Sequence, residues 1–185
     1  MKSIEILVNE HDNILRMLDV IHTSSLKILG SAPIRIPDFR KIIDFIRLYA
    51  DKTHHGKEEI HLFKVVVDEL GAMGDNLIRH GMLVEHDIAR LYVSDLEEGL
   101  DKYEAQATDE ARLAILVAAG SYEKLLRRHI QKENDVVFPF AEKSLSEKSA
   151  LWVEDETAAF EKDEDNLERR ESQLSVLYEL EKIYS

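Results

Sequence analysis

The chain has 185 residues and a formal net charge of −13, and this acidity argues against nucleic-acid binding because phosphate backbones would be repelled. It contains no cysteine, which excludes disulfides, iron–sulfur ligation and thiol catalysis. No apolar run is long enough for a membrane helix, and the amphipathic start has no signal-peptide core. We therefore expect a cytoplasmic protein without membrane or nucleic-acid partners.

Apolar residues recur at helical spacing along nearly the whole chain, which predicts an all-α protein. A first helix is expected over residues 4–29, followed by a loop over 30–37 that holds two of the three prolines. Asp38 can cap a second helix, which should run to about residue 70 and end at the glycines of 71–74.

The third and fourth helices follow after this turn. The third is expected over roughly 76–104, and Thr108 is suited to open the fourth. That helix should continue to about Asp135 and break near Pro139, because proline lacks the backbone N–H that an interior helical position needs.

The tail after residue 142 forms a separate segment. Ser144 followed by Glu147 fits a capping box, so a fifth helix is expected within 143–185. We expect it to pack on the bundle, since an exposed apolar stripe of this length would promote aggregation. The alternative is a surface for a homodimer or a protein partner.

An internal repeat links the two halves of 1–142. Glu10-His11-Asp12 recurs as Glu85-His86-Asp87, at an offset of 75 residues. On the same offset, His54, Lys57, Glu58 and Phe63 match His129, Lys132, Glu133 and Phe138. Two helical hairpins related by a pseudo-two-fold axis would form an up-down four-helix bundle, with the fifth helix added at the C-terminus.

The repeated side chains have the chemistry of metal ligands. Residues four apart share one helix face, so His54 and Glu58 point the same way, and His129 and Glu133 do likewise. His11 and His86 come from the other two helices. Burying two carboxylates without a cation is costly, and a dinuclear centre removes that cost. Imidazole and carboxylate ligands with open positions suit iron, with zinc or manganese as alternatives.

The segments that carry these residues resemble a known family. They are Glu85-His86-Asp87, His54-His55-Gly56-Lys57-Glu58-Glu59 before Leu62-Phe63, and His129-Ile130-Gln131-Lys132-Glu133-Asn134 before Val137-Phe138-Pro139. Together they resemble the hemerythrin-like, or HHE cation-binding, domains over about residues 1–142. The resemblance implies two non-haem iron ions with an oxo or hydroxo bridge. Its implied ligands are His11, His54, Glu58, His86, His129 and Glu133.

Two departures from that family bear on function. The oxygen carriers have a fifth histidine, four residues from another on the third helix, and the positions around His86 here are Met82 and Arg90. This favours a more open centre than that of a reversible oxygen carrier. The cysteine-bearing N-terminal domain of the iron-repair branch is also missing, which weakens that assignment.

The resulting hypothesis is a di-iron protein that binds or senses dioxygen, nitric oxide or peroxide. One alternative is a di-iron enzyme, either a peroxidase or a nitric oxide reductase, or an iron donor in the repair of damaged iron centres. Another is a regulatory protein in which the metal state changes the C-terminal helix.

The remaining histidines have weaker claims as ligands. His22 and His80 are expected to be structural or exposed, because their positions along the helix do not match the ligand residues. His61 lies on the face of His54 but about 10 Å further along the axis. His55 should point about 100° away from His54, which favours packing, although a role as an extra ligand stays open.

Four other polar residues lie close to the candidate ligands. Asp12 and Asp87 follow the single histidines, where they could either orient ligands or be solvated. Tyr49 and Tyr122 precede the two H-x-x-x-E motifs, and each could donate to a bound ligand or be a core tyrosine with a satisfied hydroxyl.

Overall fold

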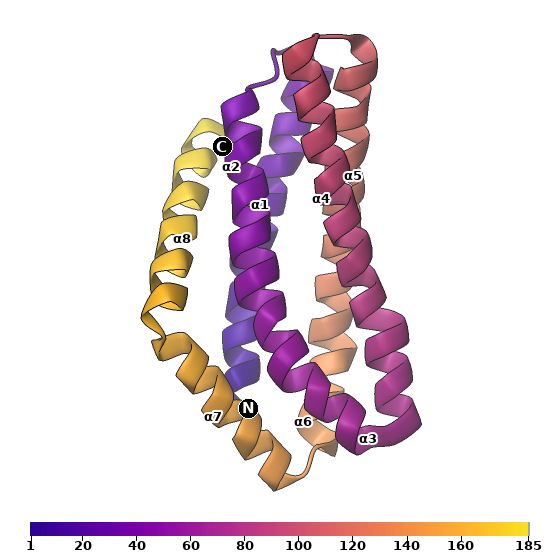
Figure 1. The fold of residues 1–185 in the computed structure, drawn as a ribbon, viewed down its shortest axis with the longest axis vertical. Coiled ribbons are helices and arrows are strands. Elements are labelled where there is room, and N and C mark those ends of the chain that lie inside the picture. Colours follow the sequence, from indigo (N-terminus) through magenta and orange to yellow (C-terminus); the bar gives the residue numbers. More distant parts are fainter. Residues whose placement is uncertain (185) are drawn as a thin grey trace.

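The structure is a computed structural model that describes residues 1–184, and within this part of the chain every regular element is helical (Figure 1). The α-helices are α1 (Lys2–Leu29), α2 (Ile36–Phe45), α3 (Phe63–Leu77), α4 (Leu83–Ala105), α5 (Asp109–Lys132), α6 (Phe138–Ser144), α7 (Glu147–Lys162) and α8 (Glu164–Tyr184). Four segments have π-helical hydrogen bonding, namely η1 (Ile46–His55), η2 (Glu58–Leu62), η3 (Ile78–Met82) and η4 (Glu133–Val137). The predicted all-α fold is confirmed.

The elements combine into four antiparallel rods, and α7 and α8 run along the outside of the bundle (Figure 1). The first rod is α1. The second runs from α2 through η1 and η2 into α3, the third from η3 into α4, and the fourth from α5 through η4 into α6. The up-down bundle with a C-terminal helical addition therefore matches the sequence prediction.

The turn between the second and third rods lies where the glycines predicted it. Gly71 has a φ of 57° and is the one non-helical residue within α3. Positive φ costs glycine little, so the chain reverses at a single residue. Gly74 makes the tight turn possible, because a Cβ there would lie 2.2 Å from the Val66 carbonyl oxygen.

Pro139 does not break the fourth rod, so this part of the prediction was wrong. The chain passes from η4 into α6 and stays helical to Ser144. Pro139 lies in the first turn of α6, directly after the π-helical segment. The proline is accommodated where the π-helical hydrogen-bond pattern of η4 changes to the α-helical pattern of α6.

Helix starts were predicted with mixed success. Thr108 caps α5 as expected, since its hydroxyl accepts a 3.2 Å hydrogen bond from the Ala111 N–H. Asp38 does not cap α2, which begins two residues earlier, and its carboxylate instead accepts a 2.8 Å bond from the Tyr184 hydroxyl. Helix α7 is capped by Ser146 rather than by the proposed Ser144.

The C-terminal segment forms two helices where the sequence predicted one. The break is at Asp163, whose side chain accepts a 3.0 Å hydrogen bond from the Asn166 N–H at the start of α8. Leu177, Leu180 and Tyr184 of α8 are buried in the core cluster shared with α1 and α2. The end of the chain is thus held against the bundle by apolar burial.

Two apolar clusters fill the interior and leave a polar layer between them. The larger includes Ile14, Phe45 and Leu126, and the smaller includes Leu7, Phe63 and Phe138. Among residues 1–184, no helix is both long and apolar enough to cross a membrane. The polar layer holds the candidate site, and apolar side chains above and below keep water from it.

Candidate metal centre

Seven side chains from all four rods converge in the polar layer. They are His11 of α1, His54 and His55 of η1, Glu58 of η2, His86 of α4, His129 of α5 and Glu133 of η4. Their ligand atoms form two groups that share Glu58, and within each group these atoms lie within 4.8 Å of one another. All six residues proposed from the sequence are brought together, and His55 joins them.

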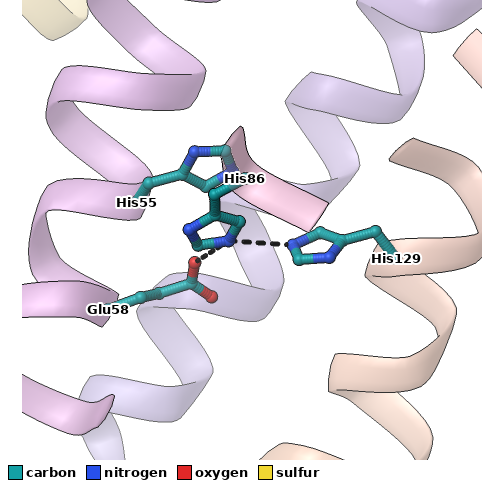
Figure 2. Close-up of side chains that lie close together, drawn as sticks. All are labelled: His55, Glu58, His86 and His129. Carbon is teal, nitrogen blue, oxygen red and sulfur yellow. Dashed lines mark hydrogen bonds and ion pairs between the residues drawn. The ribbon is translucent and has the colours of Figure 1, made fainter. Parts of the chain in front are cut away.

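Glu58 divides its carboxylate between two histidines. Oε1 lies 3.5 Å from Nε2 of His54, and Oε2 lies 3.6 Å from Nε2 of His86. Figure 2 shows the Glu58 carboxylate below His86, with His129 reaching the same point from the opposite rod. One carboxylate thus faces two separate imidazole groups.

Glu133 does the same from the other side of the bundle. Its Oε2 lies 3.2 Å from Nε2 of His11, and its Oε1 lies 3.2 Å from Nε2 of His129. The histidines therefore divide into a pair, His11 and His54, and a group of three, His86, His129 and His55. Both glutamates span the gap between the two groups.

His55 supplies the fifth imidazole, which the α-helical reading of the sequence placed elsewhere. Its ring stacks on His86 with centroids 3.7 Å apart, as Figure 2 shows. The reason is local, since η1 has π-helical hydrogen bonds and not α-helical ones. A π-helical turn takes more residues, so neighbours diverge by less than the roughly 100° of an α-helix, and His54 and His55 can both face inward.

The centre leaves buried acceptors without hydrogen bonds. All four oxygens of Glu58 and Glu133 are buried, and so are Nε2 of His11 and of His55, yet none has a hydrogen-bond partner within the described chain. The nearest histidine Nε2 atoms lie 3.2–3.6 Å from these oxygens and make no hydrogen bond to them in the described chain. Orphaned carboxylates at this depth are expensive, and cations between the two histidine groups would satisfy them.

The pKa values of the side chains in this centre also favour a bound cation. Burial and the nearby Glu133 raise the pKa of Glu58 well above its ordinary value. Burial acts on Glu133 in the same direction, but His129 and His11 outweigh it and hold its pKa well below the usual range. Burial lowers the pKa of His54 and His55, which keeps both neutral, the form that binds metals.

The outer nitrogens of the ligands are held by a second layer of acids. Nδ1 of His54 lies 3.0 Å from Glu10, whose other oxygen pairs with the buried Lys57. Histidine–carboxylate pairs of this kind fix which ring nitrogen faces a metal. Glu10, which precedes His11 in the sequence, thus orients His54.

The same contacts recur in the other half of the repeat. Nδ1 of His129 lies 3.0 Å from Glu85, which also pairs with Lys132. Burial alone would lower the pKa of His129, but Glu133 and Glu85 raise it to about 9. The E-H and H-x-x-K-E elements of the repeat are therefore explained, since glutamate, lysine and histidine form one contact network in each half.

One pair of contacts breaks this symmetry. Nδ1 of His11 lies 2.8 Å from the neutral amide of Asn134, whereas Nδ1 of His86 lies 2.8 Å from the Glu59 carboxylate. Burial alone would raise the pKa of Glu59, but hydrogen bonds from His86 and Arg90 lower it to about 2. Nδ1 of His55 also lies 3.3 Å from Asp51, so three carboxylates back the three-histidine group and one backs the two-histidine group.

The other predicted candidates lie outside the centre. His22 and His80 are more than half exposed on their side chains, as expected. Asp87 is also exposed and pairs with Arg90 at 3.1 Å, rather than orienting a ligand. The Tyr49 hydroxyl accepts a 2.9 Å hydrogen bond from Asn13, which makes it a satisfied core tyrosine.

His61 lies under α7 instead of at the metal centre. Its ring contacts Trp152 and Phe160 edge-on, and neither ring nitrogen has a hydrogen-bond partner among residues 1–184. Burial lowers its pKa, with Glu156 opposing and Lys57 assisting this shift. The protonated form is therefore disfavoured when α7 is docked.

This burial predicts a pH-dependent contribution to stability. Because the folded pKa of His61 lies below the unfolded value of about 6.5, the native state binds fewer protons and loses stability as pH falls through that value. Between pH 7.5 and 5.5, the thermal midpoint of His61→Phe should fall by about 2 °C less than the thermal midpoint of the parent chain. Scanning calorimetry of both proteins tests this, and identical losses would contradict it.

Comparison with known proteins agrees with the geometry. The model of the hemerythrin HHE cation-binding domain matches residues 2–141, which include all seven converging side chains. No curated protein and no solved structure gives a significant match to the chain. Since the match covers most of the sequence, the chain belongs to the hemerythrin HHE cation-binding domain family.

Proposed function

We propose that this protein binds two non-haem iron ions and uses them to bind or sense a small ligand such as dioxygen, nitric oxide or peroxide. The main support is that each buried glutamate directs one oxygen to each histidine group. His11 and His54 would hold one ion, and His55, His86 and His129 the other, with Glu58 and Glu133 bridging. Zinc and manganese are the alternative occupants.

The donor count supports a ligand-binding role. Three imidazoles and two carboxylate oxygens face one position, and two imidazoles and two carboxylate oxygens face the other. With the oxo or hydroxo bridge that the family resemblance implies, an octahedral iron ion would be filled at the three-histidine position and would keep a free position at the two-histidine one. The iron would supply the redox chemistry, while the chain's own residues orient the ligands and exclude water.

The decisive experiment measures metal content and absorption in air on protein purified without a chelator. We expect about two irons per chain and the near-ultraviolet bands of a diferric centre. The double variant His54→Ala, Glu58→Ala should fall to background metal, because it removes one ligand and one bridge. Less than half a metal per chain after anaerobic iron reconstitution of the parent protein would refute the proposal.

A ligand assay then separates binding from catalysis. Saturable spectral changes with nitric oxide, without consumption of the gas, would support a carrier or sensor. Turnover of hydrogen peroxide or nitric oxide well above that of free iron would favour the enzymatic alternative.

A second candidate function is metal-dependent regulation through the C-terminal helices. Glu161 of α7 bonds Lys57 at 2.6 Å and pairs with Arg170 of α8, and Lys57 in turn pairs with Glu10, which contacts His54. A continuous set of ion pairs therefore joins the outer helices to a candidate ligand. A change in charge at the centre would alter this set directly.

This candidate predicts an oxidation-dependent signal from Trp152, the one tryptophan of the chain, which lies on α7. The emission of Trp152 should differ between the ferrous and ferric forms, and Glu161→Gln should reduce that difference. Equal emission in both oxidation states of the parent protein would count against regulation by this route.

A further inference from the structure

A cavity of about 130 Å³ lies between η1 and α4 and reaches the candidate centre at His55. The His55 imidazole stacks on His86, as Figure 2 shows, and has a buried Nε2 without a partner. Because His55 also lines the cavity, it forms a wall shared by the cavity and the centre. A molecule in the cavity would therefore lie directly against His55, one of the converging side chains.

The interior of the cavity combines apolar surface with the polar side chains of Asp51, His55 and Tyr122. Ile46, Ala89 and Val93 supply buried apolar surface, and Tyr122 of α5 contributes its ring. Burial and the nearby Asp51 raise the pKa of the Tyr122 hydroxyl, which keeps it protonated. Because Tyr122 lines the cavity, its hydroxyl is the group that we expect to donate to a guest.

The charges near the mouth select against anions. Arg47 and Arg90 line the cavity, but both are engaged, Arg47 with Glu97 at 2.7 Å and Arg90 with Asp51 and Glu59 at 2.7 Å. No uncompensated cation is left there to attract an anion, and the chain as a whole carries a net charge of −13. The arrangement suits a neutral guest.

The size of the cavity sets a second limit. Apolar cavities of about 150 Å³ take up xenon or benzene and stay free of water. At about 130 Å³, this cavity holds a diatomic gas with room to spare.

We propose that this cavity is the access route and holding site through which a small neutral molecule of the size of nitric oxide or dioxygen reaches the centre. Tyr122 donates to the guest, and Ala89 and Val93 limit its size. The inference rests on the proposed function, since it assumes that the centre receives such a molecule. It adds where the molecule enters and which residues select it.

Plugging the mouth from the surface tests the route with little disturbance of the core. Ser94 lines the cavity and is solvent-exposed, so Ser94→Trp should fill the opening. Ser121→Trp is the matched control, because Ser121 lines a different hollow between α4 and α5. Ala89→Leu fills the cavity from inside and serves as a second plug should the tryptophan turn outward.

The first readout is xenon binding to the purified protein, followed by ¹²⁹Xe NMR, which does not require a functioning centre. We expect saturable binding in the parent protein, loss of it in Ser94→Trp and Ala89→Leu, and retention in Ser121→Trp. Tyr122→Phe should keep xenon binding, since it removes only the hydroxyl. Absence of xenon binding in the parent, or binding that survives both plugs, overturns the proposal.

The second readout is stopped-flow association of nitric oxide with the ferrous protein. Both plugs should slow association at least tenfold at unchanged iron content, and Tyr122→Phe should slow it roughly threefold through the lost hydrogen bond. Unaltered rates in both plugged variants overturn the route. A chain that takes up no iron but binds xenon in a plug-sensitive manner refutes the proposed function and still supports the cavity as a small-molecule site.

Discussion

Iron loading should raise the thermal midpoint of the parent protein by about 10 °C, and Glu58→Gln should abolish most of that rise. A ligand that binds only the folded state at a thousandfold excess over its dissociation constant adds about 4 kcal/mol. In a domain of this size, each kcal/mol moves the midpoint by about 2–4 °C. Glu58 faces both histidine groups, so its loss weakens both metal positions together.

Without iron, the stabilities of the parent protein and Glu58→Gln should rank in the opposite order. Both oxygens of Glu58 are buried without hydrogen-bond partners, and Glu133 lies close enough to raise its pKa. Glutamine keeps the shape and removes the negative charge, so metal-free Glu58→Gln should be at least as stable as the metal-free parent. Functional sites commonly cost stability in this way.

Calorimetry of four samples, each protein with and without iron, checks both halves of this prediction. Glu59→Gln is a useful control, since Glu59 is half-buried on the same helix but contacts the outer nitrogen of His86. It should lower iron affinity by about 10–100-fold without abolishing loading. A rise of equal size in Glu58→Gln and the parent would rule out Glu58 as a bridge.

Most of the fold could be predicted from the sequence because helical periodicity and the repeat act locally. Thr108 and Gly71 carry their signals in their own chemistry, a hydroxyl that caps and a residue that tolerates positive φ. The predicted helix break at Pro139 was wrong because the effect of this proline depends on the hydrogen-bond pattern before it, which is π-helical. That pattern depends on tertiary contacts and leaves no clear mark in the sequence.

The candidate site was likewise predicted in part from the sequence. The repeat identified six of the converging side chains, since a shared offset does not depend on helix geometry. His55 has no counterpart in the repeat, where Ile130 takes its place, and its inward direction results from the π-helical turn. The partners Glu10 and Glu85 were present in the repeated E-H-D motif, but only the fold shows that each contacts the histidine of a neighbouring rod.

The repeat also provides an internal control for the buried ion pairs, and Lys57→Met should destabilise the protein far more than Lys132→Met. The Lys57 side chain is 1% exposed and pairs with Glu10 and Glu161, whereas the Lys132 side chain is 41% exposed and pairs with Glu85. Removing one partner of a buried ion pair costs about 3–5 kcal/mol, because the other charge is left uncompensated. An exposed pair contributes about 1 kcal/mol or less.

The difference arises from the C-terminal helices. Helix α7 covers Lys57 with Glu161 and with the ring of Phe160, whose centroid lies 5.5 Å from Nζ. Lys57→Met should therefore lower the thermal midpoint by about 10 °C at equal metal content, and Lys132→Met by about 2 °C. Thermal unfolding followed by circular dichroism measures both, and equal shifts would show that the covering helices do not isolate Lys57 from water.

A double variant identifies the cause of the loss. If Lys57→Met acts by stranding the Glu10 carboxylate, then adding Glu10→Gln should recover part of the lost stability, since the uncompensated charge is removed. Burial already raises the pKa of Glu10 even with Lys57 in place, so the carboxylate is poorly tolerated without a cation. Iron content would respond differently, because Glu10→Gln also weakens the contact that orients His54. Recovered stability with reduced iron content would therefore show that the ion pair serves folding and that the histidine contact serves the centre. If the losses of stability and of iron content were instead additive, Lys57 would have a role in packing alone.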